Sequence, residues 1–154
     1  MVFRENERGE TLIYSNLFYT SDDYKASSKN DWKLYTTDIF DRKTSRSCHY
    51  LSLLLDPLNV KDDDCTPDNH AACKMGDLVK KHKQLTIGAQ NNRFSKQIFL
   101  DQSLSLSFIE GSSRSIFLVI MEKNNNNKIL ACAKLNMIRS KEVKAIIDQD
   151  GVQG

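Results

Sequence analysis

The chain has 154 residues, of which 40% are hydrophobic and 27% are charged, and its formal net charge is +2. This composition fits one globular domain that is large enough to bury a core of its own. The near balance of charge argues against nucleic-acid binding, and no apolar run approaches the roughly 20 residues that a membrane-spanning helix needs. The densest basic run, Val79–Lys83, is interpreted as a solvated loop rather than a phosphate-binding patch.

The first half of the chain is predicted to form three strands separated by polar loops. A short strand precedes the turn-like run "ENERGE", and the aromatic and β-branched residues of Thr11–Thr20 and Trp32–Phe40 favour two more strands. The polar run Ser21–Asp31 is a predicted loop. The longest irregular region is expected at Asp41–Lys83, and it contains most of the candidate site residues.

The second half shows alternating or continuous apolar runs that are typical of short strands. The predicted strands are Leu85–Ala89, Phe94–Leu100, Ser103–Phe108, Ser115–Met121 and Lys128–Ile138. A short helix is the alternative for the last of these, because alanine, leucine and lysine favour helices.

Eight short strands at this spacing predict an all-β fold, an antiparallel Greek-key sandwich or barrel of about seven or eight strands. The domain is expected to span residues 1–138. Residues 139–154 are expected to be a C-terminal tail with one or two helical turns.

The order of several short motifs resembles that of the Cu/Zn superoxide dismutase family. The series runs "DPL" (Asp56–Leu58), "MGDL" (Met75–Leu78), then Leu85–Ser107, "RSIFLVIMEK" (Arg114–Lys123) and "ILAC" (Ile129–Cys132). The resemblance covers about residues 2 to 135 and implies the family's Greek-key fold. It also implies that the family's first strand is missing, because Met1 falls where the second strand begins.

The resemblance implies that the copper site is lost. In the family, a His-x-His pair on one strand and a histidine at a later strand end bind copper. This chain has Tyr35 and Thr37 at the paired positions and Met121 at the later one. Copper in a redox role prefers imidazole ligands, so these residues do not rebuild the site.

The zinc site is degenerate by the same comparison. Leu54 and Lys74 occupy zinc-histidine positions, and Asp77 alone matches a family ligand. Both family sites together need six histidines, whereas the chain has three. Two of these, His49 and His82, are interpreted as loop or partly buried residues. No catalytic residue and no cofactor is therefore predicted.

The substrate channel of the family is also missing. A long charged loop and an arginine guide superoxide there, whereas "NNNNK" (Asn124–Lys128) and Ile129 replace them here. Steering of an anion needs a field of fixed charges, which asparagine does not supply.

The cysteines are predicted to form two disulfides. The resemblance implies that Cys48 pairs with Cys132, and Cys65 is expected to pair with Cys73 as a clip that replaces zinc. A metal site is the alternative: His70, Asp77, Cys65 and Cys73, with Asp64, form a ligand-rich cluster without the spacing of a zinc knuckle.

The cysteine pairs favour an oxidising compartment, outside the cell or in the secretory pathway. The first 20 residues are charged throughout and contain no signal peptide. A chain cut from a larger precursor would reconcile these observations, and it leaves room for a homo-oligomer or tandem repeats.

Two functions follow from the sequence. The first is a pseudoenzyme, a catalytically inactive superoxide dismutase-like domain that serves as a structural or protein-interaction module for an unknown protein partner. The alternative is a degenerate zinc or copper protein with residual redox activity. In the first case, the leucines of Leu51–Leu55 and Met121 are expected to fill the vacated metal cavity, since methionine fits irregular gaps.

Overall fold

The structure is a computed structural model, and it describes residues 1–37, 48, 51–90, 95–112, 114–123, 128–139, 142–149 and 152–153. Most of the described elements are β-strands, and every pairing between them is antiparallel. The all-β expectation is therefore confirmed. The Greek-key connection of the superoxide dismutase family stays a prediction.

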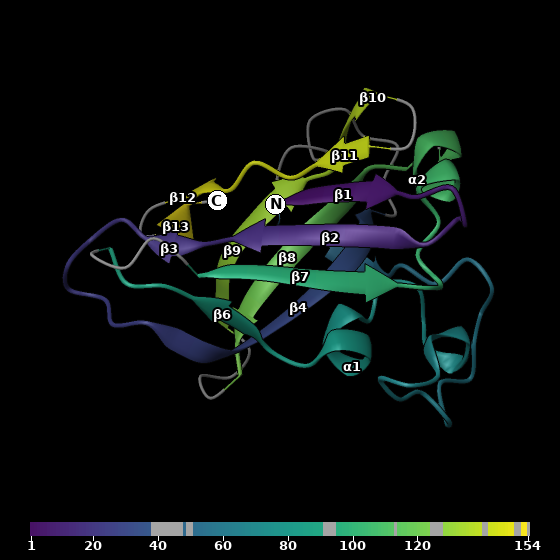
Figure 1. The fold of residues 1–154 in the computed structure, drawn as a ribbon, viewed down its shortest axis with the longest axis horizontal. Coiled ribbons are helices and arrows are strands. Elements are labelled where there is room, and N and C mark those ends of the chain that lie inside the picture. Colours follow the sequence, from purple (N-terminus) through teal and green to yellow (C-terminus); the bar gives the residue numbers. More distant parts are fainter. Residues whose placement is uncertain are drawn as a thin grey trace.

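One sheet, called the front sheet here, has the order β10-β11-β1-β2-β7. Its strands are β10 (Asn136–Arg139), β11 (Glu142–Lys144), β1 (Val2–Glu5), β2 (Thr11–Asn16) and β7 (Lys96–Asp101). Strands from both ends of the chain thus lie side by side in one sheet (Figure 1).

A second sheet, called the back sheet here, has the order β5-β4-β8-β9, with β6 also paired to β4. Its strands are β5 (Leu51–Leu54), β4 (Ser27–Thr37), β8 (Ile116–Glu122), β9 (Lys128–Lys134) and β6 (Leu85–Ile87). Figure 1 shows β4, β8 and β9 crossing behind β1, β2 and β7.

Three short strands form a small third sheet, and three short helices lie in the connections that the structure describes. The strands are β3 (Phe18–Tyr19), β12 (Asp148–Gln149) and β13 (Val152–Gln153). The helices are the 3-10 helix η3 (His70–Ala72), α1 (Leu78–His82) and α2 (Leu106–Gly111). None of the described helices is long and apolar enough to cross a membrane.

The core lies between the two large sheets. Phe3 and Ile13 of the front sheet belong to the same buried cluster as Trp32, Leu34 and Leu118 of the back sheet. On β4 the buried residues recur at every second position, as expected for a strand with one face on a core. The two sheets therefore pack as a sandwich.

The expected strand at Ser103–Phe108 is wrong, because the chain turns into helix α2 there. Asp101 accepts hydrogen bonds from the backbone N–H groups of Ser103 and Leu104, both at 2.9 Å. Ser105 then caps the helix by accepting a hydrogen bond from the N–H of Phe108 at 3.2 Å. Serine hydroxyls favour such helix starts over strand pairing.

The helical turns expected after residue 138 are also wrong, as is the helix alternative for Lys128–Ile138. Residues 128–139 form β9 and β10, and β11 to β13 follow. Val143 is fully buried, and it lies opposite Phe3 of β1. Burial of Val143, Ala145 and Ile147 in the sandwich outweighs any local helix preference.

Candidate functional site

The segment between β5 and α1 is clamped onto the back sheet at Gly76. The Gly76 N–H donates to the carbonyl of Leu55 at 2.7 Å, and the Leu34 N–H donates to the carbonyl of Gly76 at 2.8 Å. A side chain at position 76 would collide with the Leu34 carbonyl oxygen and with Leu55. The "MGDL" motif therefore needs glycine for a close approach between two backbones.

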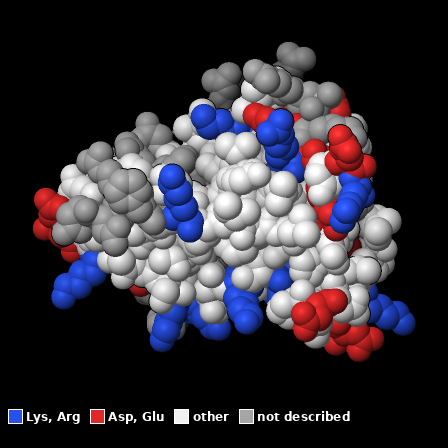
Figure 2. Space-filling model, in the orientation of Figure 1, with Lys and Arg blue, Asp and Glu red and all other residues white. Residues whose placement is uncertain are grey.

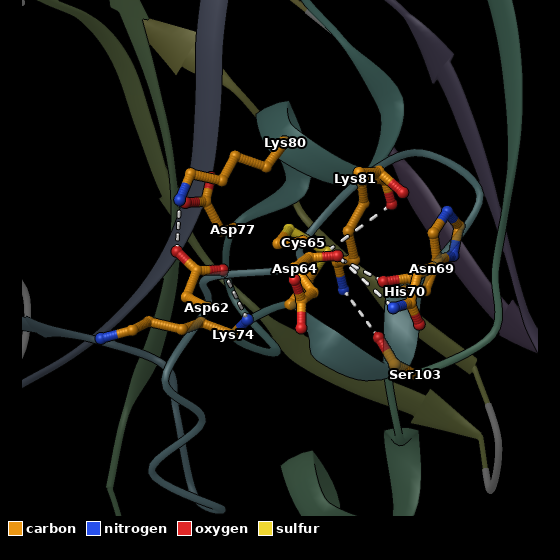
Figure 3. Close-up of a disulfide and its surroundings, with 12 residues drawn as sticks. Asp62, Asp64, Cys65, Asn69, His70, Lys74, Asp77, Lys80, Lys81 and Ser103 are labelled. Carbon is orange, nitrogen blue, oxygen red and sulfur yellow. Dashed lines mark hydrogen bonds and ion pairs between the residues drawn. A yellow bond between two sulfur atoms is a disulfide. The ribbon is translucent and has the colours of Figure 1, made fainter.

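The Cys65–Cys73 pair closes a small loop within this segment (Figure 3). The two Cα atoms are 4.5 Å apart. Asp62 holds the loop from outside, because its carboxylate pairs with Lys80 and accepts from the Lys74 N–H at 3.4 Å. The hydrogen bond from Lys80 to Asp62 raises the pKa of the Lys80 amino group. These contacts fix a region that has little apolar core.

Asp77, the aspartate that matches a family zinc ligand, is buried beside a lysine. Its Oδ2 lies 3.7 Å from Nζ of Lys33, and its Oδ1 has no hydrogen-bond partner among the described residues. Burial, and then the charge of Asp77, raises the pKa of the Tyr35 phenol. The carboxylate thus lies among groups that are neutral or positive.

The other two zinc positions offer no ligand. Lys74 places its Nζ 3.8 Å from Oδ2 of Asp56, and Leu54 lies opposite Tyr35 in the β4–β5 pairing. A hydrocarbon side chain and an ammonium group do not bind zinc. The residues at these positions therefore do not fit the family's zinc ion.

The expected copper positions lie on the outer face of the back sheet and form an apolar cluster. Tyr35 and Met121 pack there against the buried residues Phe117, Val119 and Cys132, with Cys48 and Leu51 nearby. Thr37 is buried and lies opposite Leu51. We call this set the outer cluster. None of these described residues carries an imidazole, so the set does not fit a redox copper ion of the family's kind.

Cys48 and Cys132 of the outer cluster form a disulfide pair, with their Cα atoms 6.2 Å apart. Both expected cysteine pairs are thus present at disulfide distance. Because the Cys65 and Cys73 sulfur atoms are bonded to each other in the structure, they offer no thiolates to the alternative metal cluster.

The expected leucine plug forms only in part. Leu51 joins the outer cluster, and Leu55 is buried in the main core between the sheets. Leu53 is exposed, and Leu54 is partly buried. Neighbouring residues of a strand point to opposite faces, so four leucines in near succession cannot fill one cavity.

Ile129, at the position of the guiding arginine, is exposed on β9. Residues 124–127 of the asparagine run lie outside the described residues, as does His49.

A second set of polar residues lies on the buried side of α1, in the run that is interpreted from the sequence as a solvated loop. We call Lys81, His82, Asp101 and His70 the buried ion cluster. Nζ of Lys81 is 2.7 Å from Oδ2 of Asp101, and Nε2 of His82 is 2.9 Å from the same oxygen. Lys81 also donates to the carbonyl of Met75 at 2.9 Å and lies 3.2 Å from Oγ of Ser103.

His70, the fourth residue of the buried ion cluster, lies on the 3-10 helix η3. Its Nδ1 accepts a hydrogen bond from the Gln102 N–H at 3.2 Å and lies 4.0 Å from Oδ1 of Asp101. The His70 and His82 rings meet edge to face, 4.9 Å apart. An open hollow of about 440 Å³, lined in part by both rings, leads to this point from the surface.

The charges in the buried ion cluster stabilise each other. Burial alone would raise the pKa of the Asp101 carboxyl, but hydrogen bonds from His82 and Lys81 and the Lys81 charge hold it well below its usual range. Burial lowers the pKa of the Lys81 amino group, and the Asp101 charge opposes this. Burial also lowers the pKa of His70.

His70, His82 and Asp101 bring one possible ligand atom each within 4.8 Å of the others. However, the ammonium group of Lys81 already lies against the carboxylate, and the remaining Asp101 oxygen accepts backbone hydrogen bonds. The arrangement is therefore a self-neutralised ion cluster in which lysine takes the place of a cation.

The sequence contains a signal for this cluster that the prediction of a solvated loop overlooks. Leu78, Lys81 and His82 are spaced three and four residues apart, so they share one face of a helix. Leu78 is fully buried. A basic pair on the buried face of a short helix predicts an acidic partner inside the protein.

Comparisons of the chain with protein-family models, with curated proteins and with solved structures found no match.

Proposed function

We propose that the chain is a catalytically inactive superoxide dismutase-like domain that acts as a structural or protein-interaction module. The outer cluster carries this proposal. At the positions where the resemblance implies copper ligands, Tyr35 and Met121 pack with Phe117 and Val119. Apolar side chains in close contact stabilise a fold, and this set supplies none of the imidazoles that a redox copper site of the family's kind uses.

One feature of the fold supports the resemblance. The back sheet carries the "RSIFLVIMEK" and "ILAC" motifs on paired strands, with Val119 opposite Cys132.

Both cysteine pairs are at disulfide distance, which is compatible with an oxidising, extracellular environment. In such a setting two disulfides stabilise the domain without a metal. The binding partner would then recognise the surface of the sandwich rather than a reaction centre.

A superoxide assay tests the absence of activity. Protein incubated with copper and then dialysed against a chelator should show only the background rate of the buffer. A triple variant, Tyr35→His, Thr37→His and Met121→His, serves as the matched control, since it restores imidazoles at the three positions. Copper retained after dialysis is expected in the variant alone. Chelator-resistant turnover by the unaltered chain would overturn the proposal.

The alternative is a degenerate zinc or copper protein, and two observations favour it. Oδ1 of Asp77 is buried without a hydrogen-bond partner among the described residues, and His70, His82 and Asp101 lie close together. Elemental analysis of the purified chain, beside His70→Gln and Asp77→Asn variants, separates the two functions. Stoichiometric metal that either variant loses would support the alternative, and a melting temperature unchanged by a strong chelator would support the metal-free module.

A further inference from the structure

The exposed face of the front sheet carries a row of aligned side chains. Lys144, Val2, Tyr14 and Ile98 lie directly opposite one another across β11, β1, β2 and β7. Directly opposed residues of antiparallel strands have neighbouring side chains on the same face. A second row, with Leu12 opposite Leu100, continues the apolar surface on β2 and β7.

Part of this face forms an open groove of about 780 Å³. Its apolar wall includes Val2, Tyr14, Phe18, Ile98 and Ile146. Ile98 and Ile146 are 64% and 63% exposed, which is high for isoleucine. Small-molecule sites are typically clefts of roughly 300–1,000 Å³ lined by apolar and aromatic side chains with a few polar groups. The groove has that size and composition.

The charged side chains that line the groove have one sign. They are Lys96 and Lys144, and none of the described lining residues is acidic. Lys96 precedes Ile98 by two residues on the same face of β7, and Lys144 lies beyond Val2 in the aligned row, on β11. Figure 2 shows the middle of this face as uncharged, with both basic and acidic side chains at its borders.

We propose that this groove binds an amphipathic anion, a free fatty acid of medium chain length. The acyl chain would lie on Ile98, Tyr14 and Val2, and its carboxylate would pair with Lys96 beside Ile98, since Lys144 lies at the other end of these residues. Long lysine side chains place their ammonium groups at the edge of an apolar surface, where they form charge-assisted hydrogen bonds with a carboxylate. The side-chain amide of Asn16, opposite Lys96 in the β2–β7 pairing, adds a donor at the same end.

A fatty acid suits the groove better than a second copy of the chain does. Two lysines without an acidic lining residue would repel the same pair on a copy whose groove met this one, whereas a carboxylate neutralises them. The inference rests on the front sheet alone and is independent of the proposed function, which rests on the back sheet.

Titration calorimetry of the intact chain with decanoate below its micelle concentration tests the inference. Decyltrimethylammonium, with the same chain length and the opposite charge, is the matched ligand. Decanoate should bind at least tenfold more tightly than this cation. The double variant Lys96→Glu and Lys144→Glu should reverse that preference.

Ile98→Glu should weaken decanoate binding at least tenfold, because it places a like charge where the acyl chain lies. Ile129→Glu is the matched control, since Ile129 is 45% exposed on the opposite sheet and should bind decanoate within twofold of the unaltered chain. Circular dichroism checks that both variants fold.

Three outcomes would overturn the inference. These are equal binding of the anionic and cationic ligands, unchanged decanoate binding by Ile98→Glu, and binding to anionic vesicles without binding to monomeric decanoate. Sedimentation of the ligand-free chain as a dimer that Ile98→Glu converts to a monomer would also overturn it, since a second copy would then occupy the face.

Discussion

The outer cluster is apolar and the buried ion cluster is charged, and the sequence predicted only the first of these two characters. The positions expected to derive from a polar metal site, Tyr35 and Met121, lie in apolar packing. The run expected to be a solvated basic loop delivers Lys81 and His82 to a buried carboxylate. A buried charge is stable where each charged group has a partner, whereas apolar side chains pack stably without one.

The two clusters are held together by different kinds of contact. Around Asp101, a lysine supplies the positive charge, and backbone N–H groups donate to the other carboxylate oxygen. At the outer cluster, a disulfide and aromatic and aliphatic contacts hold the side chains together. The four predictions that follow separate these two kinds of support.

The largest effect is expected from the disulfide over the outer cluster. Cys48→Ala with Cys132→Ala opens a link across 84 residues, whereas Cys65→Ala with Cys73→Ala opens one across 8. The chain-entropy model gives losses of about 4–5 and about 2.5 kcal/mol in the free energy of unfolding. Urea unfolding without reductant measures both. If removal of the Cys65–Cys73 disulfide lowered the free energy of unfolding more than removal of Cys48–Cys132, the outer cluster would be stable without its disulfide.

Two neighbouring lysines of α1 test the buried ion cluster. Lys81→Met leaves the Asp101 carboxylate without its ammonium partner, and we expect a loss of about 3–5 kcal/mol. Lys80→Met removes the pair with Asp62, in which 48% of the Lys80 side chain is exposed, and should cost about 0–1 kcal/mol. Equal losses in urea unfolding would mean that Lys81 is not held by Asp101.

Two leucines near the end of β5 test which cavity the apolar run fills. Leu55 is 2% exposed in the main core, so Leu55→Ala should lower the free energy of unfolding by about 2–5 kcal/mol. Leu53 is 49% exposed, and Leu53→Ala should change it by about 0.5 kcal/mol or less. If Leu53→Ala destabilised the protein more than Leu55→Ala in thermal unfolding, the leucine run would instead fill the outer face, as the expected plug requires.

The smallest effect concerns pH and His70. Because burial lowers the pKa of His70 in the folded chain, the unfolded chain binds this proton first as the pH falls. Stability from His70 is therefore complete above the unfolded pKa of about 6.5 and declines below it. For one proton the slope is at most about 1.4 kcal/mol per pH unit.

His70→Gln should flatten this dependence below about pH 6.5, because glutamine keeps an acceptor for the Gln102 N–H and does not titrate there. Urea unfolding across this range measures the slope. An identical slope in the variant would assign the dependence to another group. At lower pH, loss of the Asp101 charge is expected to add to the decline, since the pKa of Asp101 is lowered as well.

The sequence by itself determined several of the strands, because alternation with a period of two reports burial on one face of a strand. The runs at Thr11–Thr20 and Ser115–Met121 became β2, β3 and β8 with small changes at their ends. It also predicted the two cysteine pairs that lie at disulfide distance, with a metal site left open as the alternative for Cys65 and Cys73.

Only the tertiary structure decided the roles of residues whose partners are distant in the chain. Ser103–Phe108 alternates like a strand, but Asp101 and Ser105 bind its N–H groups and turn it into a helix. The last residues become strands because β1 and the sandwich core receive Val143. The role of Lys81 follows from its contact with Asp101, which is distant from it in the sequence. Such long-range contacts stabilise conformations that the local sequence pattern does not favour, so these roles can be read only from the tertiary structure.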